Sequence, residues 1–329
     1  MTVESTIQES VQKKQKLSSG AIQQVLAFAS LLALFVFFSF ASSSFLQYSN
    51  IMGILLSTAV IGILALGATF VIITGGIDLS VGTVMTLSSV LTGVIVVNAG
   101  MPIFIGVLGG IVTGAACGFL CGFAITKLRI PPFIATLAMM MIAKGLALVI
   151  SGAAPIYFSD HPNFTKISLG SIIPGINIPN AVIIFFIMAI IGAVILSKTV
   201  LGRYNFSIGS NEEATKLSGV NVDFWKIAIY SLAGAFTGIA GVLMASRLNS
   251  AQPALGQGYE LEAIAAVVIG GTSLSGGKGT IVGTVIGALI MSVLTNGLRI
   301  MSIPQEWQTV VVGLVIILAV YADVLRKKD

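Results

Sequence analysis

Residues that could do covalent or metal chemistry are scarce in this chain. Its single histidine, His161, falls in a stretch between apolar runs. Its two cysteines, Cys117 and Cys121, stand four residues apart within one apolar run, with no further histidine or cysteine near enough to complete a metal site. We interpret the cysteines as packing residues and predict neither a metal site nor catalytic residues, so the protein is not expected to be an enzyme.

Charged side chains within apolar runs are the next candidates for chemistry. Asp78, with Ser80 close by, could line or gate a transport pathway, or it could cap the helix that starts there by accepting from the amides of Ser80 and Val81. Lys144 could face an aqueous cavity or pair with an acid, or it could extend to the outer membrane interface. Both stay candidate pathway or gating residues.

Two glycine-rich segments resemble each other. GGIDLSVG at Gly75 to Gly82 and GGTSLSGG at Gly270 to Gly277 agree at five of eight positions, and each follows an apolar run. Glycine allows unusual backbone angles, and serine can satisfy the amides that such a break frees. We predict broken or re-entrant segments related by a parallel internal repeat. Ser273 and Ser275 join Asp78, Ser80 and Lys144 as candidate pathway residues.

The second glycine-rich segment is not a phosphate-binding loop. Within GTSLSGGKGT at residues 271 to 280, the required spacing puts Thr272 at the first glycine position and Gly279 at the position of the magnesium-binding hydroxyl. The chain is therefore not expected to hydrolyse nucleotide itself.

The one long polar insert between apolar runs spans Gly202 to Val222. Ser210 and Glu213 have the spacing of a capping box, Glu212 and Glu213 would lie in the first helical turn, and Gly219 suits a left-handed helix end. The predicted helix has roughly eight residues, which is too short to be stable alone in water. It therefore needs a partner surface.

The elements that position these residues follow from composition. The chain has 329 residues, of which 56% are hydrophobic and 9% charged, and its mean hydropathy is +1.03. Apolar runs long enough to cross a bilayer recur along it, without the alternation of a membrane β-barrel. We predict an all-α polytopic membrane protein.

We expect about ten spans, at residues 23–41, 51–73, 83–98, 103–125, 133–151, 181–197, 226–246, 259–272, 280–298 and 308–324. An even number places both termini on one side, and the enrichment of basic residues on the cytoplasmic side identifies it. In this arrangement most basic residues are cytoplasmic: Lys13, Lys14, Lys16, Lys127, Arg129, Lys198, Arg203, Lys216, Lys226, Lys278, Arg326, Lys327 and Lys328. Both termini are thus predicted to be cytoplasmic.

The predicted organisation is one transmembrane domain, residues 23–325, between a cytoplasmic tail at 1–22 and another at 326–329. The first run is expected to remain as a helix rather than act as a cleaved signal peptide. Small residues should let the fourth and seventh spans pack closely, namely Gly109, Gly110, Gly114, Gly118, Gly122, Gly234, Gly238 and Gly241.

Two loops of this domain are candidates for contacts with partners. The cytoplasmic loop at 198–225 contains the polar insert. The external loop at 152–180 contains four prolines and should form an irregular or partly helical cap. Asp160, Glu260 and Glu262 are candidate contacts with an external partner, although the two glutamates are most simply interpreted as solvated or helix-capping residues.

The polar insert resembles the cytoplasmic loop of ABC importer permeases, whose motif is Glu-Ala-Ala, three residues, then Gly. Here Glu213, Ala214 and Thr215 precede Gly219, with threonine in place of the second alanine. GGIDLSVG, LGRYNFSIGSNEEATKLSGVNV, SAQPALGQGYELEAIAAVVIGGTSLSGGKGTIVGT and NGL resemble more specifically the ribose/xylose/arabinose/galactoside group. The resemblance covers residues 45 to 325.

This resemblance implies the membrane-spanning subunit of a monosaccharide importer in the bacterial plasma (inner) membrane, working as a homodimer among membrane lipids. Its partners would be a cytoplasmic ATPase, which holds the ATP and magnesium, and an external or periplasmic sugar-binding protein; nucleic acid is not among them. The chain itself would need no cofactor. The residues of the coupling helix would be Ser210, Asn211, Glu212, Glu213, Ala214, Leu217 and Gly219.

The mechanism implied is alternating access, in which closure of the ATPase dimer moves two coupling helices and so opens the pathway to one side or the other. The sugar would be a ribose-type pentose or a related monosaccharide. The rival hypotheses are an ion-coupled secondary sugar transporter, for which only Asp78 and Lys144 could bind the ion, and a membrane-embedded enzyme.

Overall fold

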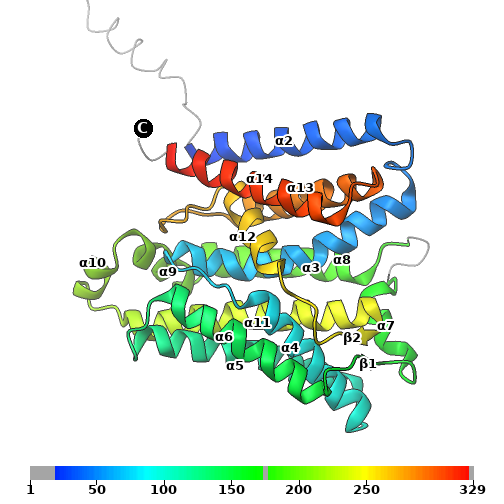
Figure 1. Ribbon diagram of the computed structural model, residues 1–329. Helices are drawn as coiled ribbons and strands as arrows, with labels where there is room; N and C mark the ends of the chain where they lie inside the picture. Colours follow the sequence, from blue (N-terminus) through cyan, green and yellow to red (C-terminus); the bar gives the residue numbers. More distant parts are fainter. Residues whose placement is uncertain (1–18, 173–176, 326–329) are drawn as a thin grey trace, which may run out of the picture.

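The computed structural model describes residues 19–172 and 177–325. The described part is nearly all helical, as predicted (Figure 1). Residues 1–18 of the predicted tail at 1–22 and the whole predicted tail at 326–329 lie outside it, and residues 19–22 belong to the first described helix. Its helices and short strands are α2 (Ser19–Ala41), α3 (Tyr48–Ile73), α4 (Val81–Gly93), η1 (Val94–Asn98), α5 (Ile103–Thr126), α6 (Pro132–Ser151), β1 (Ile156–Tyr157), α7 (Pro162–Leu169), α8 (Asn180–Lys198), α9 (Val200–Ser210), α10 (Glu212–Leu217), α11 (Val222–Leu248), β2 (Ser250–Ala251), α12 (Tyr259–Ile269), α13 (Ile281–Ile300) and α14 (Gln305–Leu325).

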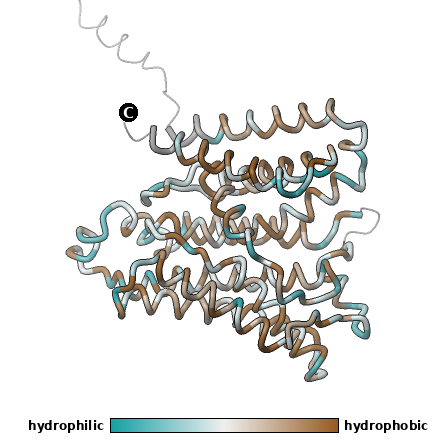
Figure 2. Tube along the Cα trace, in the orientation of Figure 1, coloured by the Kyte–Doolittle hydropathy of each residue, from teal (hydrophilic) through white to brown (hydrophobic). Residues whose placement is uncertain are grey.

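The distribution of polar residues divides the molecule into two polar ends and an apolar middle. In Figure 2 hydrophilic residues gather around α10 at one end and at the loops near α7 at the other, and the long helices between them are mainly hydrophobic. Many large apolar side chains are exposed along these helices, including Phe40 at 89% and Val149 at 78%. Water does not favour such surfaces, whereas lipid does, so the middle of the molecule is the membrane-embedded part.

The number of complete spans differs from the prediction of ten. Within the described residues, eight helices are long and apolar enough to cross a membrane, and α14 has a shorter apolar stretch at Gln305–Tyr321. The predicted span at 259–272 is wrong as a full crossing, because α12 has only 11 residues, about 16 Å at ~1.5 Å per residue, against a hydrocarbon core of about 30 Å.

The second half of α3 forms the centre of the core. Every residue from Thr58 to Ile73 is buried, and α8, α11, α12 and α13 all pack around this helix. This burial explains why α3 is apolar on all sides instead of amphipathic, since it contacts protein in every direction.

The closest helix pair joins α5 and α11, as the small residues predicted. A Cβ atom on Gly114 would lie against the backbone of Gly234 and Gly238, and one on Gly118 would meet the backbone of Tyr230. The two helices therefore touch backbone to backbone, which is the arrangement that small residues permit between membrane helices.

The predicted break after the span at 51–73, which is α3 in the structure, is present. Residues 74–80 have no helical structure and lead from the end of α3 into α4, with Gly75 in the left-handed region at φ +80°. The chain continues from α4 into the π-helical turn η1 before the loop at its far end.

The loop predicted to be external forms a small cap at the end opposite α10 (Figure 1). It contains α7, which agrees with the partly helical prediction, and β1, which pairs antiparallel with β2. The Ser246 hydroxyl of α11 accepts from the Ser168 amide at 2.9 Å and donates to the Phe164 carbonyl at 2.7 Å, so the cap is fixed to the end of a long helix. The strand pair was not predicted, because two-residue strands from distant segments leave no periodic pattern.

Candidate functional site

The helix α10 projects from the polar end of the molecule (Figure 1). Asn211, Glu212, Glu213 and Ala214 are exposed, and Leu217 is exposed to 89% although it is apolar. The two glutamates lie in the first turn and Lys216 in the last, which complements the helix dipole. Of the predicted coupling residues, Glu212, Glu213, Ala214 and Leu217 therefore share one accessible helix, which Asn211 precedes.

The capping of α10 differs from the prediction. Asn211, not Ser210, is its N-cap, and the Asn211 side-chain oxygen accepts from the Ala214 amide at 2.9 Å. Ser210 is the last residue of a separate helix, α9, which was not predicted, so the proposed Ser210–Glu213 capping box is wrong. Asparagine caps helices as well as serine does, and only Asn211 has the extended backbone that a cap needs, with φ −160°.

The end of α10 is as predicted, although the helix has six residues instead of about eight. Gly219 follows it in the left-handed region at φ +84°. Its amide donates to the Lys216 carbonyl at 3.0 Å, which satisfies one of the free carbonyls of the last turn.

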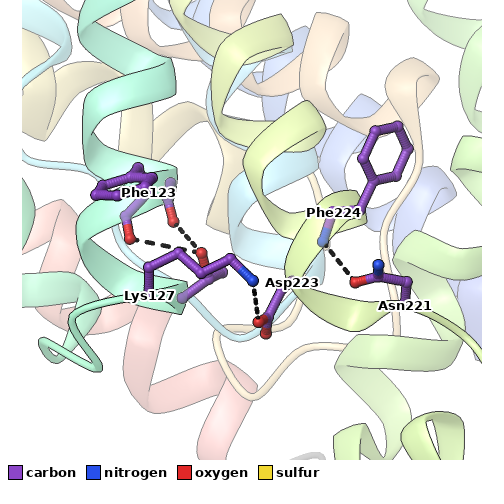
Figure 3. Close-up of polar contacts among 7 residues, drawn as sticks. Phe123, Lys127, Asn221, Asp223 and Phe224 are labelled. Carbon is purple, nitrogen blue, oxygen red and sulfur yellow. Dashed lines mark hydrogen bonds and ion pairs between the residues drawn. The ribbon is translucent and has the colours of Figure 1, made fainter.

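Two ion pairs connect helices at this end of the molecule. Glu212 pairs with Lys226 of α11 at 2.6 Å, so the first turn of α10 is tied to the next helix. Figure 3 shows the second pair, in which Lys127 at the end of α5 reaches Asp223 at 2.8 Å, beside the Asn221 cap of α11. The first pair therefore joins α10 to α11, and the second joins α11 to the end of α5.

The two glycine-rich segments meet directly behind α10. The Gly277 amide donates to the Ile73 carbonyl at 2.9 Å, which joins the loop after α12 to the end of α3. Gly209, two residues before the α10 cap, packs against the same Ile73 carbonyl and leaves no room for a Cβ atom. Backbone from α3, α9 and the 270–280 loop thus forms one junction, which we call the glycine junction: Ile73, Gly209 and Gly277.

Asp78 lies buried in the segment between α3 and α4. Its Oδ1 accepts from the Ser80 amide at 2.8 Å and from the Ser80 hydroxyl at 2.6 Å, and both residues are at most 5% exposed. The carboxylate closes a local turn at Ser80, which is itself the N-cap residue of α4, so the predicted helix cap on the amides of both Ser80 and Val81 is not formed. The arrangement stabilises the turn that begins α4.

The N-termini of α4 and α12 meet inside the molecule. Gly82 packs against the Gly256 carbonyl without space for a Cβ atom, and the Thr86 hydroxyl donates to the Leu255 carbonyl at 2.6 Å. Gly256 takes a φ of +97°, which suits glycine. Interrupted helices whose N-termini converge within the membrane are typical of transporters.

The candidate contacts with an external partner separate in the structure. Asp160 is exposed in the outer loop, where a partner could reach it. Glu260 is buried and accepts from the Gly258 amide at 3.0 Å, so it caps α12 and is not presented outward. Glu262 lines an internal cavity instead of the outer surface.

The remaining pathway candidates also lie in different places. The Lys144 ammonium donates to the Gln257 side chain at 3.3 Å and has no acid partner within the described residues. Ser273 is buried and Ser275 is exposed, both in the 270–280 loop, where the Ser275 amide donates to the Ser273 hydroxyl at 3.4 Å. The structure therefore does not gather Asp78, Lys144 and these serines into one site.

A cavity of about 700 Å³ lies between α3, α11, α12, α13 and α14. Sequence reasoning missed it, because its polar lining comes from five separate elements. The one available signal was Arg247 and Arg299 at the ends of two apolar helices, where a charge is costly unless water or a partner is near. The polar residues that line it are Ser57, Arg247, Gln257, Tyr259, Glu262, Thr295, Arg299, Gln305, Gln308 and Thr309.

Fold and site together define a multi-pass helical transport protein with interrupted helices and one exposed polar helix. Residues 50–320 match the family described as the permease component of the branched-chain amino acid transport system, and the chain belongs to this family. It is a permease of the ABC transporter class and a multi-pass protein of the bacterial inner membrane.

Individual relatives are similar over most of their length. The chain is 44% identical to the ribose import permease protein RbsC of Bacillus subtilis (strain 168), over 98% of this chain and 99% of that one. It is 42% identical to RbsC of Escherichia coli (strain K12), over 89% and 91%, and 38% identical to the fructose import permease protein FrcC of Rhizobium meliloti, over 82% and 76%. No solved structure matches the chain.

Proposed function

We propose that this protein is the membrane-spanning subunit of an ATP-driven importer of a monosaccharide, a ribose-type pentose or a related sugar. The names of its relatives support the substrate class, because the similar permeases import ribose, fructose, xylose or allose. ATP is hydrolysed by a separate cytoplasmic ATPase subunit, and the permease moves the sugar by alternating access.

The observation that carries this proposal is α10. A six-residue helix is not stable alone, yet this one is capped, tied to α11 and carries an almost fully exposed leucine. An exposed apolar residue flanked by charges suits insertion into a groove on a partner protein. The groove of a cytoplasmic ATPase would cover Leu217 and pair with Glu212 and Glu213.

The glycine junction supplies a route from this helix to the membrane helices. Gly209 lies in the last turn of α9, next to α10, so a displacement of α10 would move it. Gly209 in turn contacts the end of α3 and the loop that precedes α13. Backbone contacts without intervening side chains transmit such a displacement with little compliance. Closure of the ATPase dimer would thus reposition α3, α4 and α13.

A second copy of the chain completes the permease in this proposal. The non-helical residues 252–258 lead to the short α12 between α6 and α14, and Ala254 and Gln257 in this segment are exposed. Lipid cannot hydrogen-bond free backbone groups, so this face needs protein or water against it. A homodimer that encloses an aqueous pathway supplies both.

The outer cap formed by α7 and the β1–β2 pair is the place where a sugar-binding protein would dock. It carries the exposed Asp160 and is fixed to α11 through Ser246. Docking there would act on a helix that also reaches the α10 end.

Co-purification tests the coupling role. The permease is isolated in mild detergent with its ATPase as the native chain, as Leu217→Asp, as Glu213→Arg and as the control Leu169→Asp, which changes an exposed leucine of α7 at the opposite end. We expect the first two variants to lose the ATPase and the control to retain it. A permease that accumulates sugar without an ATPase and follows an ion gradient would instead establish the ion-coupled secondary transporter.

A further inference from the structure

The cavity of about 700 Å³ opens near the outer ends of the long helices. Arg247 lies in the last turn of α11 and Arg299 in the last turn of α13, at the end where β2 and the outer cap lie. Glu262, in the first turn of α12, lines the same cavity. The cavity is thus placed where a solute from outside could enter it, on the outer side of the contact between the N-termini of α4 and α12.

The three charged side chains that line this cavity do not form ion pairs with one another. Among the described residues, no ion pair within 4.0 Å involves Arg247, Glu262 or Arg299. The one side-chain hydrogen bond that any of the three forms there is the one that Arg247 donates to the Ser57 hydroxyl at 3.3 Å. Arg247 and Glu262 are half-buried, where charged groups usually find a close partner, and Arg299 is exposed. Groups that lack one keep their hydrogen-bonding capacity for a ligand.

The chemistry of the lining indicates which ligand. Amides and hydroxyls outnumber the charged groups, with Gln257, Gln305, Gln308, Thr295 and Thr309 supplying both donors and acceptors. The Glu262 carboxylate would repel a strongly anionic ligand, and the two arginines would repel a cationic one. Tyr259 adds an aromatic face against which an apolar ring face can pack. A neutral ligand with many hydroxyl groups and an apolar ring face satisfies this set.

We propose that this cavity is the outer receiving site for a neutral monosaccharide, with Arg247, Glu262 and Arg299 hydrogen-bonding its hydroxyl groups. The proposal rests on the proposed import function and adds the location and residues of the site. Gln257 lines the cavity and also accepts from Lys144 of α6, so it lies at the boundary between the receiving site and the face towards the second copy. Binding must be weak, because a site on a pathway has to release what it accepts.

Cysteine accessibility tests the proposal in the assembled transporter. Thr309→Cys places a thiol in the cavity, and Val310→Cys places one on the neighbouring residue, which is outside the cavity lining and 49% exposed. The native Cys117 and Cys121 are buried, so the unmodified chain serves as background. The reagent is a charged, membrane-impermeant methanethiosulfonate, which reacts with the hydrated thiolate. The probes are ribose, xylose, allose and fructose, with betaine as an osmotic control.

We expect Thr309→Cys to be labelled and Val310→Cys to be nearly inert, and a transported sugar to slow the labelling of Thr309→Cys about twofold at half occupancy. Labelling that no transported sugar slows, in vesicles where ATP-dependent uptake of that sugar is measured, overturns the receiving site and leaves the import function standing. Absence of ATP-dependent uptake of all four sugars overturns the import function and this proposal together.

Glu262→Gln gives a second, conservative test. It keeps the shape of the side chain and removes the charge, so sugar uptake at subsaturating concentration should fall about tenfold while ATPase association is unchanged. The control is Glu306→Gln, the same change at an exposed position of α14 outside the cavity lining. Protection of Thr309→Cys by a sugar phosphate in place of a neutral sugar would overturn the assignment of a neutral ligand.

Discussion

The backbone amide of Gly277 donates a hydrogen bond of 2.9 Å to the carbonyl oxygen of Ile73. This bond joins two segments that are far apart in the sequence, namely the end of α3 and the loop between α12 and α13. Gly209 packs against the same carbonyl, two residues before the cap of α10. The helix α10, which is proposed to bind the ATPase, is thus linked to the membrane helices through backbone contacts.

Gly209→Ala is expected to uncouple ATP hydrolysis from uptake. The added Cβ would overlap the Ile73 carbonyl, and backbone atoms cannot move aside as a flexible side chain can. ATPase activity and sugar uptake measured in the same proteoliposomes give the coupling ratio. The matched control is Gly53→Ala on α3, where no atom lies within 4 Å of the added Cβ. Equal coupling ratios in the two variants would contradict a role for the glycine junction.

Asn211→Ala should weaken α10, because the Ala214 amide loses its acceptor. Loss of an N-cap typically costs about 1 kcal/mol of helix stability, so the affinity for the ATPase should fall about fivefold. Asn211→Ser should restore it, and Ser210→Ala should have little effect because Ser210 is not the cap. A larger loss from Ser210→Ala than from Asn211→Ala would favour the capping box that the sequence alone suggested.

The Lys127–Asp223 ion pair should contribute little to stability. Its side chains are 51% and 44% exposed, and exposed pairs typically contribute at most about 1 kcal/mol. We expect Lys127→Ala to shift the thermal unfolding midpoint in detergent by no more than a few degrees, and the shift to shrink as salt is added. A large, salt-independent shift would show that the lysine has another structural role.

Gly114→Leu should destabilise the fold severely. The helices α5 and α11 touch through backbone at this point, so a leucine side chain forces them apart and costs at least about 2 kcal/mol. Val112→Leu on the same helix enlarges a side chain that is 63% exposed and should be tolerated. Thermal unfolding and the yield of monodisperse protein measure both variants.

Asp78→Asn separates the two interpretations of this residue. An amide oxygen can still accept from Ser80, so the turn before α4 and the thermal stability should be retained, whereas Asp78→Ala removes the acceptor and should lower stability. If uptake also survives in Asp78→Asn, the residue acts as a cap. Loss of uptake by a stable Asp78→Asn protein with normal ATPase binding would establish a pathway role for the carboxylate.

The parts of the fold that depend on local composition were predictable from the sequence. Long apolar runs became helices, Gly219 ended α10, and the glycines of α5 and α11 predicted a close contact. The failures occurred where tertiary contacts decide the outcome. The run at 259–272 is apolar enough to suggest a span, but α12, which begins at Tyr259 as predicted, already ends at Ile269, and the residues from 270 to 280 are not helical.

The candidate site shows the same division. A serine and an asparagine side by side are equally good caps, so only the backbone could show that Asn211 serves this role and Ser210 ends α9. Glu260 and Glu262 stand two residues apart, yet one is a buried cap and the other lines the cavity. That difference depends on Gly82 and α14, which are distant in the sequence.

The shortness of α12 also constrains how the protein is made. An insertion machinery that selects segments of about 20 apolar residues has no reason to release an 11-residue helix with two glutamates into lipid. This helix packs against α3 and α13, and α13 is synthesised only afterwards. The ribosome must therefore complete α13 before α12 finds its place, so we expect α12 and α13 to enter the membrane together and not one after the other.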